Sequence, residues 1–536
     1  MSEGVEGGAR PKRLSLRLPL QRFSVPVRRS VREPPQVLHG HSKVEWAWRD
    51  LEQAVDGLRR GRPELSAGQP IWPWQKSVLT LVIPILAAIA ALAPDRFTLI
   101  VAAALALPFF CVVVLRTAAL CRTLSAKPPE ARGVALPNSA LPLPRYSILV
   151  PLYDEAAIVP DIVEALLSLD YPVDRMEVFL ALEESDTATR KAVDATSLPP
   201  HLKAVVVPDG EPRTKPRALN YVLPRTTGDL IVIYDAEDMP EPDQLRRAVR
   251  ALSASPELGC VQARLNVLNA EENWLTRQFA IEYTVLFDCM LPTLEALRLP
   301  VPLGGTSNHF TRSALMDVGA WDPFNVTEDA DLGIRLARYG WTVGVVESTT
   351  WEEAPANFSN WLKQRTRWLK GWMQTYLVHM RNPARTARDL GWRQFAGLQV
   401  LMGGLILSAL VHPWFYVAAA AELAAGPLTT LGSSALAHTL WIVTTLNLLL
   451  GYATGVALGC VAVAARRRRG LAIWALLMPV YWLLISFAAY RAMLQLVTQP
   501  YRWEKTQHRP RATFCGTRAA IRSLRTGRSE DDAPRA

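Results

Sequence analysis

Long apolar stretches on either side of a charged middle region constrain this chain most. Two of them, residues 77–93 and 97–116, are separated only by a short link, and each is close to the roughly 20 residues needed to cross a bilayer. Three more follow the middle region, at residues 395–423, 436–465 and 471–497. With 50% hydrophobic residues, the chain is too apolar for an ordinary soluble enzyme. The sequence therefore predicts a membrane protein with a soluble domain between two groups of helices.

Positive charge gathers in the two terminal arms and beside one apolar stretch. Four consecutive arginines, Arg466 to Arg469, follow that stretch, a pattern typical of cytosolic membrane flanks. We therefore attribute the net charge of +10 to contact with membrane lipid and expect no nucleic acid partner. The six cysteines lack paired spacing, which indicates neither a zinc site nor a disulfide framework and favours a reducing cytosol for the soluble part. The basic, Pro-rich start favours a cytosolic N-terminus without a signal peptide.

These patterns divide the chain into six predicted regions. A basic cytosolic arm containing an amphipathic helix precedes a transmembrane hairpin, and a Pro-rich linker leads to the soluble domain with its interface helices. Further transmembrane and interface helices and a basic cytosolic tail follow. The predicted bounds are, in that order, 1–75, 76–118, 119–144, 145–390, 391–500 and 501–536.

The number of membrane crossings stays open between four and six. Pro479 interrupts the last apolar stretch, and both the arginine cluster before this stretch and the basic tail after it are expected in the cytosol. A stretch that starts and ends on one side is not a simple crossing. An in-plane or re-entrant helix pair split at Pro479 is therefore favoured over a sixth crossing.

The soluble domain alternates β-branched runs with helical stretches, which is the pattern of a parallel α/β sheet. The runs are YSILVPLYD, EVFLALEE, KAVVVPD and DLIVIYDAED, and each ends in acidic or turn residues. Functional groups in such sheets collect at the carboxyl ends of the strands. We therefore expect the site at that edge of the sheet.

The last of these runs ends in three carboxylates, Asp235, Glu237 and Asp238. Carboxylates this close repel one another, and a divalent cation such as Mg²⁺ or Mn²⁺ is the simplest partner that holds them together. A diphosphate bound through that cation would need the same arrangement. The alternative is a solvated turn in which an aspartate caps a helix.

Several motifs occur in a fixed order across the soluble domain. They are VPLYDEA (150–156), LEESDTAT (182–189), GEPRTKPRALN (210–220), YDAED (234–238), TEDADLGIRLARYGW (327–341) and QRTRWLKGW (364–372). Together they resemble the family 2 glycosyltransferases, specifically the cellulose-synthase-like processive branch. The matching positions for nucleotide-sugar binding are Tyr153, Glu155, Glu183, Glu184, Lys215 and Asp235. The sequence departs from the family where glutamates replace aspartates, and which of Glu237 and Asp238 binds the metal with Asp235 stays open.

The TED motif of this family corresponds here to Thr327, Glu328 and Asp329, and its aspartate is the family's catalytic base. An inverting transfer needs a carboxylate that takes the proton of the acceptor hydroxyl opposite the departing nucleotide. The resemblance therefore implies that Asp329 is the base, with Glu328 raising its pKa. In isolation, the same segment is also a helix start with Thr327 as the cap.

Acceptor and pyrophosphate contacts are expected from two further segments. One segment matches QxxRW, and the three named positions of this motif share one face of a helix. A cation on that face can contact the pyrophosphate while an indole stacks on the acceptor sugar. An interface helix would place such residues similarly. The other, PLGGTSNHF, stands in place of the family's acceptor loop, and its glycines allow close approach. The expected residues are Gly304, Gly305, Thr306, Gln364, Arg367 and Trp368.

The resemblance implies an α/β GT-A-type nucleotide-sugar domain, a Rossmann-like mixed sheet flanked by transmembrane α-helices. It implies an inverting, metal-dependent enzyme in a bacterial-type inner membrane with a cytosolic catalytic domain. The enzyme would move a sugar from an NDP-sugar, expected to be a UDP-sugar, to a growing β-linked polysaccharide coupled to export, with a glycan acceptor and accessory export subunits as partners. Two alternatives stay open: single addition to a lipid or surface acceptor, and a non-catalytic secretion component with a decayed transferase domain.

Overall fold

The computed structural model describes residues 41–125, 143–425, 434–506 and 509. Predictions for the first 40 residues, for most of the Pro-rich linker and for most of the basic tail lie outside the described residues. The chain divides into two units, Met1–Trp46 and Ala47–Ala536. In the first unit, only the start of the helix α1 (His41–Gly61) is described. All features below belong to the second unit.

Eight strands form one mixed sheet. Their bounds are β1 Tyr146–Leu152, β2 Met176–Glu183, β3 Leu202–Val207, β4 Leu230–Ile233, β5 Met239–Pro240, β6 Leu258–Val267, β7 Asn308–Thr311 and β8 Thr342–Glu352. The order across the sheet is β3-β2-β1-β4-β7-β6-β8-β5. The strands β1 to β4 are those predicted from the sequence, and they pair in parallel. Their carboxyl ends therefore lie along one edge of the sheet, whereas β7 is antiparallel to both of its neighbours.

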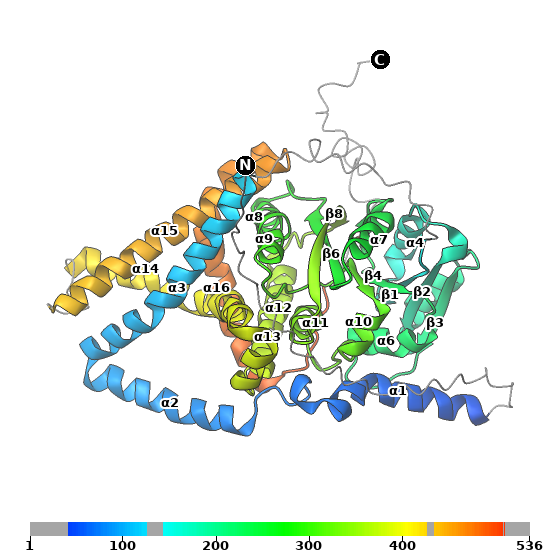
Figure 1. The fold of residues 1–536 in the computed structure, drawn as a ribbon, viewed down its shortest axis with the longest axis horizontal. Helices are drawn as coiled ribbons and strands as arrows, with labels where there is room; N and C mark the ends of the chain where they lie inside the picture. Colours follow the sequence, from blue (N-terminus) through cyan, green and yellow to red (C-terminus); the bar gives the residue numbers. More distant parts are fainter. Residues whose placement is uncertain (1–40, 126–142, 426–433, 507–508, 510–536) are drawn as a thin grey trace, which may run out of the picture. The chain divides into compact units, whose positions relative to one another are not determined.

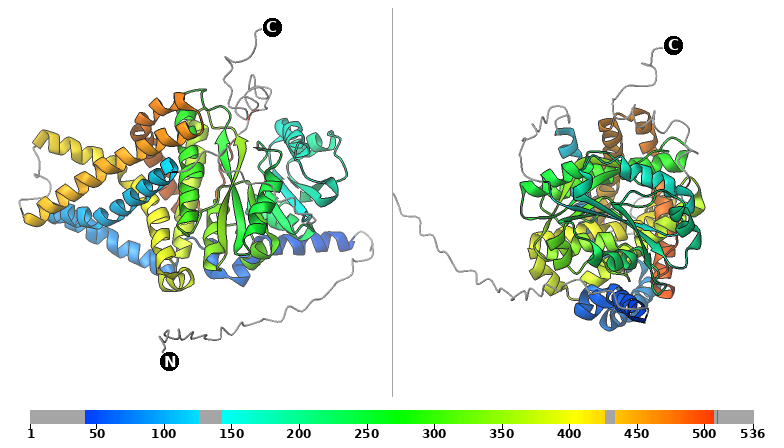
Figure 2. Two further views of the ribbon diagram at one scale, coloured as in Figure 1. Left: turned by 45° about the horizontal axis from the view of Figure 1, so that its top comes forward. Right: turned by 90° about the vertical axis from the view of Figure 1, so that its right-hand side faces the viewer.

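Both faces of the sheet are buried, because helices cover each of them (Figure 2, right). Alternate residues of a strand point to opposite faces, and Ile148 and Leu149 accordingly belong to two different core clusters. This burial explains why the central strands are continuous apolar runs without alternation. The covering helices are α4 Val159–Leu167, α5 Thr187–Asp194, α6 Lys215–Val222, α7 Gln244–Ala254, α8 Trp274–Thr284, α9 Leu291–Ala296, α10 Arg312–Asp317 and α11 Glu328–Arg338.

Two helices connect this α/β domain to the apolar part of the chain. The helix α12 (Phe358–His379) begins where the Asn357 side chain accepts a hydrogen bond from the Asn360 amide. Its buried Trp361 donates a hydrogen bond to the hydroxyl of Tyr481 in α16 (3.0 Å). The helix α13 (Pro383–Leu398) follows after a short turn. The elements that carry the acceptor motif therefore pack directly against the apolar helices.

Five segments among the described residues are long and apolar enough to cross a membrane: Pro73–Leu92, Arg96–Ser125, Pro383–Ala421, Ala435–Ala465 and Arg469–Thr498. They overlap the helices α2 (Pro73–Leu92), α3 (Pro94–Ser125), α14 (Gly404–Ala425), α15 (Ala435–Ala465) and α16 (Met478–Thr498), and the third also includes α13. The helices α3 and α15 pack side by side, and α14 packs on α16. Figure 1 shows α2, α3, α14 and α15 reaching away from the sheet.

The last apolar segment changes its helix type just before Pro479. A 3₁₀-helix, Arg469–Leu477, precedes α16, in which Pro479 holds an early position. Both ends of this segment contact the α/β domain. At its start, Arg466 forms an ion pair with Asp288. Beyond its end, Lys370 Nζ donates to the main-chain carbonyl of Gln499 (3.1 Å).

Candidate active site

The acidic turn after β4 separates into one inward-facing and two cavity-facing carboxylates. Asp238 is fully buried, and its Oδ2 accepts hydrogen bonds from the Asp235 amide (2.7 Å) and from the Thr306 hydroxyl. Burial, and then the charges of Asp235 and Glu237, raise the pKa of Asp238 well above its usual range. The cavity beside this turn is lined by Asp235 and Glu237. Asp238 therefore closes the turn, and its neighbours face the site.

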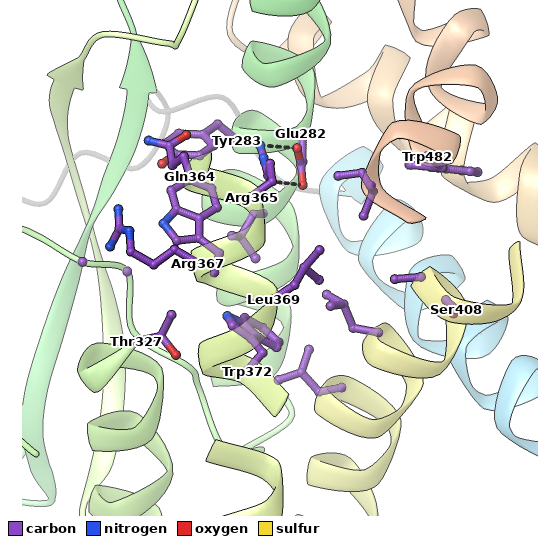
Figure 3. A pocket seen from close by; sticks show the side chains of 18 of the residues that line it. Glu282, Tyr283, Thr327, Gln364, Arg365, Arg367, Leu369, Trp372, Ser408 and Trp482 are labelled. Carbon is purple, nitrogen blue, oxygen red and sulfur yellow. Dashed lines mark hydrogen bonds and ion pairs between the residues drawn. The ribbon is translucent and has the colours of Figure 1, made fainter. Parts of the chain in front are cut away.

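Most of the predicted site residues line this one cavity, whose volume is about 1040 Å³. They are Tyr153, Glu155, Glu183, Lys215, Asp235, Glu237, Gly304, Gly305, Thr306, Thr327, Glu328, Asp329, Gln364, Arg367 and Trp368. Figure 3 shows Thr327, Gln364 and Arg367 on the side of the pocket that belongs to the α/β domain. Glu184 and Asp238 are the predicted site residues outside this lining. The structure thus brings segments almost 220 residues apart around a shared space.

Gly305 marks where the predicted metal turn and the predicted base meet. A Cβ atom placed on Gly305 would lie 3.4 Å from Asp329 Oδ2 and 3.8 Å from Asp235 Oδ2. The two carboxylates therefore flank the same loop residue. Because glycine has no side chain, the space between them stays available for a ligand.

Lys215 places a cation among these carboxylates. It is the first residue of α6, and its Nζ donates to Asp235 Oδ1 and to the main-chain carbonyl of Gly305 (2.6 Å). Burial lowers the pKa of Lys215, but the charges of Asp235 and Glu328 outweigh burial and raise it overall. The ammonium group is therefore charged at neutral pH and is suited to bind diphosphate oxygens.

No group of three or more His, Cys, Asp or Glu residues in the described part of the chain is arranged to hold a metal ion by itself. Mg²⁺ usually binds through one or two carboxylates and completes its shell with waters and substrate phosphates. Asp235 and Glu237 fit that partial set. Glu352 at the end of β8 lines the same cavity, and burial and the charges of Asp238 and Glu237 raise its pKa well above the usual range. This accumulation of hard oxygen donors suits Mg²⁺ or Mn²⁺ held jointly with a diphosphate.

Glu328 and Asp329 form the first turn of α11. Asp329 Oδ1 accepts a hydrogen bond from the Ala330 amide (2.8 Å). Burial raises the pKa of Asp329 to about 6, and burial together with the charge of Asp329 raises the pKa of Glu328 to about 8. At neutral pH, Asp329 is therefore ionised and Glu328 is largely protonated, which suits Asp329 as the proton acceptor.

Thr327 holds the N-cap position of α11, as the helix-start interpretation predicts, but its side chain makes no capping hydrogen bond. Its buried hydroxyl has no hydrogen-bond partner among the described residues. A buried hydroxyl without a partner costs free energy unless a ligand or water satisfies it. Thr327 lines the cavity and is therefore available to a substrate.

The second acidic motif, residues 182–189, mainly makes contacts within the protein. Glu183 is buried in an ion pair with Arg217, and burial raises the pKa of Glu183 to about 7. Glu184 accepts a hydrogen bond from the Asp209 amide (3.0 Å). Asp186, which sequence reasoning missed, accepts from the amides of Asp154 and Thr189. Asp186 therefore fixes the loop that presents Tyr153 and Glu155, and its N-cap position before α5 was the signal available in the sequence.

The QxxRW helix contributes a stacked aromatic and cationic cluster. Arg365, which the sequence analysis did not single out, forms an ion pair with Glu282 (Figure 3), and its guanidinium lies 4.6 Å from the ring centroid of Trp368. Trp368 also stacks on Tyr283, with ring centroids 6.0 Å apart. Arg365 thus fixes the indole of Trp368 at the wall of the cavity. Arg367 lines the same cavity.

The segment after α16, residues 499–506, contacts the side of the cavity that Tyr153 and Glu155 line, and we call it the closing segment. Lys505 Nζ contacts Glu155 Oε1 (2.8 Å) and the main-chain carbonyl of Asp154 (2.9 Å). The ring of Trp503 lies under the Arg367 guanidinium, with 4.4 Å between the ring centroid and Arg367 Cζ. Sequence reasoning assigned these residues to a basic tail, because their contacts bridge about 350 positions and have no local pattern.

The region that carries these motifs is similar to known proteins. A family model described as "Glycosyltransferase like family 2" matches residues 144–371. Beta-monoglucosyldiacylglycerol synthase of Synechocystis sp. is 33% identical over 51% of this chain and 57% of the relative. Probable glucomannan 4-beta-mannosyltransferase 1 of Arabidopsis thaliana is 27% identical over 42% of this chain and 43% of the relative. The aligned region thus spans about half the length of these curated relatives.

A solved structure also aligns with the chain. The mannosyltransferase PcManGT from Pyrobaculum calidifontis, in complex with GDP-Man and Mn²⁺, is 23% identical over 69% of this chain and 98% of that chain, with a TM-score of 0.45. The mixed sheet and the family match confirm the predicted GT-A-type fold and the predicted family. Residues 144–371 of this chain therefore form a family 2 glycosyltransferase domain.

Proposed function

We propose that this protein transfers a sugar, with inversion, from a nucleoside diphosphate-sugar to an acceptor hydroxyl, and that Asp329 is the catalytic base. The observation that carries this proposal is the pair of carboxylates on either side of Gly305, Asp235 from the acidic turn and Asp329 from α11. One is placed to hold the activated donor and the other to take a proton. The geometry suits a reaction in which both substrates meet at that glycine.

In the proposed reaction, the oxygen of the acceptor hydroxyl attacks the anomeric carbon of the donor sugar. Asp329 accepts the proton of that hydroxyl at the same time. The bond from that carbon to the diphosphate oxygen breaks, and the nucleoside diphosphate leaves from the opposite face. A bound Mg²⁺ or Mn²⁺, held by Asp235 and Glu237, would supply charge stabilisation for the leaving diphosphate. Lys215 and Arg367 add two fixed positive charges, both lining the cavity.

We further propose that four helices, α2, α3, α14 and α15, cross the membrane. The segment from Arg469 to Thr498 is long enough to be a fifth, but the residues on either side of it contact the same α/β domain. A segment that returns to the side from which it starts does not cross, so it would lie in the interface plane. Four crossings then place both flanks of the α/β domain on the side of the arginine cluster, which is the cytosolic side by the positive-inside rule.

The acceptor enters from the membrane side in this proposal. The cavity that holds Asp329 also extends between α3, α14, α15 and α16. We therefore propose an acceptor anchored in the membrane, consistent with single addition to a lipid. The second candidate is a processive polysaccharide synthase with export, and the aromatic QxxRW helix along the same cavity favours it. A UDP-sugar donor belongs to the proposal by family resemblance, and export subunits would belong to the second candidate alone.

The test uses the full-length protein in nanodiscs with labelled nucleotide sugars and Mn²⁺. We expect metal-dependent transfer, and a loss of at least about 100-fold in kcat for Asp329→Asn, because general-base catalysis contributes roughly 10²–10⁴-fold. Asp194→Asn on the exposed surface of α5 is the matched control, with activity unchanged. Equal activity in Asp329→Asn would refute the assignment. Product size separates single addition from polymer synthesis.

A further inference from the structure

One basic residue lies within an apolar candidate span and lines the cavity. Arg116 belongs to α3, six residues before Arg122, or about 9 Å deeper along the helix axis. No carboxylate among the described residues forms an ion pair with Arg116. A charged residue in such a helix is costly and marks a functional site unless a partner is present. Arg116 Nη1 donates only to the main-chain carbonyl of Gly451 among the described residues (3.5 Å), which leaves its charge without a counter-ion.

Aromatic and polar side chains surround Arg116 and shape a site. Its guanidinium lies 5.3 Å from the ring centroid of Trp482, whose ring stacks on Tyr452. Gly455 makes room for this pair, since a Cβ there would meet the Trp482 ring at 2.7 Å and Arg116 Nη1 at 3.5 Å. The chain thus uses a glycine to hold a cation and an indole at the wall of the cavity.

His412 connects the helix α14 to the same cluster. One of its ring nitrogens lies 3.2 Å from the Tyr452 hydroxyl, and the other lies 3.1 Å from the main-chain carbonyl of Pro479. The carbonyl can only accept, so the nitrogen facing Pro479 carries the proton and the other nitrogen accepts from Tyr452. Both ring nitrogens of His412 then have hydrogen-bond partners within the protein. Arg116 is left as the positive group that faces the cavity.

In the proposed topology, the cluster lies at the depth of lipid headgroups. Trp482 is near the start of α16, which lies in the interface plane in that topology. Tryptophan and tyrosine favour that depth. Farther along α3, α14 and α15, the lining is apolar and suits acyl chains; it includes Phe97, Val101, Leu105, Phe109, Phe415 and Leu448. Figure 3 shows Trp482 and Ser408 on the side of the pocket opposite Arg367 and Thr327.

We propose that Arg116, with Trp482 and Tyr452, binds the phosphate of an anionic glycerophospholipid, and that this lipid is the sugar acceptor. Its acyl chains lie along the apolar lining, and its headgroup hydroxyl extends through the cavity toward Asp329. The proposal rests on the proposed glycosyl transfer and on the proposed membrane arrangement. A neutral diacylglycerol would leave the charge of Arg116 without a partner, and a polysaccharide would leave the apolar lining without a partner.

The test compares acceptors for the full-length protein in mixed micelles: phosphatidylglycerol, diacylglycerol, or a soluble glycan without lipid. We expect Arg116→Gln to raise the KM for phosphatidylglycerol at least tenfold with less than a twofold change in the donor KM, and Arg116→Lys to keep most of the affinity. Arg122→Gln, on the same helix but outside the cavity lining, is the matched control and should behave as wild type. Native mass spectrometry measures retained phosphatidylglycerol independently of turnover, and Arg116→Gln should lose it.

Three outcomes would overturn the inference. They are phosphatidylglycerol binding and KM unchanged in Arg116→Gln, equal use of diacylglycerol by wild type, and elongation of the soluble glycan without lipid. Failure of the proposed function looks different, because wild type would then neither transfer nor hydrolyse a nucleotide sugar with Mn²⁺ in any micelle. The mass-spectrometric comparison would still decide whether Arg116 binds the lipid. Thermal unfolding of each variant, with Arg116→Lys as the charge-preserving case, separates loss of binding from misfolding.

Discussion

Gly371 in α12 lies directly against Thr327, the residue before the helix that carries the proposed base. A Cβ atom on Gly371 would fall 2.3 Å from Thr327 Oγ1 and 2.7 Å from its Cβ. Such contacts are sterically impossible, so a larger residue forces the two helices apart. The QxxRW helix and the TED helix are therefore spaced by this one glycine.

Gly371→Ala should lower kcat at least about tenfold, because even small misplacements of reacting groups are costly in rate. The KM for the donor should also rise, because α12 carries Arg367, one of the proposed contacts to the diphosphate. Steady-state kinetics in nanodiscs measure both quantities. Gly61→Ala at the end of α1 is the control, since a Cβ there meets nothing within 4 Å. A Gly371→Ala variant with wild-type kcat would show that the spacing is not critical.

The pH dependence should follow the pair Glu328 and Asp329. Burial raises the pKa of Asp329 to about 6, so the base is ionised only above that pH, and kcat/KM should rise through about pH 6. Glu328 is protonated in this range, because its pKa is raised to about 8. Glu328→Gln should therefore keep the rise near pH 6 and remove any second change near pH 8. A flat profile between pH 5 and 8 would contradict this assignment.

Metal dependence should separate Asp235 from Asp238. Asp235→Asn removes a cavity-facing carboxylate, so the apparent affinity for Mn²⁺ should fall roughly 10–100-fold, as for other changes at metal sites. Asp238 is buried and bonded to Thr306, so Asp238→Asn should mainly lower the unfolding temperature. Activity titrated with Mn²⁺ after chelation, together with thermal unfolding, measures both effects. A larger metal effect from Asp238→Asn than from Asp235→Asn would reverse the two roles.

Stability should depend on Asp331, two residues beyond the proposed base. Asp331 is fully buried, and its carboxylate forms an ion pair with Arg335 (2.7 Å) and contacts His379 (3.0 Å). Asp331→Asn should cost about 3 kcal/mol, because it leaves a buried arginine without its counter-ion.

The same ion pair predicts a pH dependence of stability. Burial alone would raise the pKa of Asp331, but Arg335 and His379 outweigh it and lower the value. The stabilisation is therefore present above the ordinary pKa of an aspartate and is lost as the pH falls below about 4. Thermal unfolding at pH 7 and at about pH 2 should show a smaller difference between wild type and Asp331→Asn at the lower pH. An equal difference at both values would argue against the charge as the cause.

The closing segment should affect donor binding. Lys505 holds Glu155 and the main chain next to Tyr153, so Lys505→Ala should loosen the loop of the donor site and raise the donor KM about tenfold. Lys191→Ala on the exposed surface of α5 is the control. Calorimetric titration with the nucleoside diphosphate and Mn²⁺ measures the affinity without turnover. Unchanged affinity in Lys505→Ala would show that the closing segment only covers the site.

The sequence predicts the sheet well, because β1 to β4 are apolar runs with acidic ends, and burial on both faces requires that pattern. It also singles out Asp235 and Asp329, because their motifs stand in the order of a known family and not because their local patterns exclude a capped turn or a helix start. It does not distinguish Asp238 from Glu237. Their positions differ by one residue, and only the hydrogen bond from Thr306 shows which carboxylate points inward.

Local sequence patterns could not predict the residues that reach the site from distant parts of the chain. Glu352 at the end of β8 and Lys505 in the closing segment reach the site through the sheet order and the return of α16. Arg365 differs from its neighbour Arg367 only in the helix face it occupies, and its role becomes clear once Glu282 is seen beside it. Sequence periodicity places a residue on a face but does not identify what packs there.

The hydroxyl of Tyr501 donates to the main-chain carbonyl of Gly68 (2.6 Å), so the segment leaving α16 touches the segment that leads into α2. The entry to the first apolar helix and the exit from the last are thereby held together at one point. A cut between Tyr501 and Lys505 would leave this contact in place but would remove the contact of Lys505 with Glu155. Lys505 therefore sets the practical limit for shortening the protein on that side.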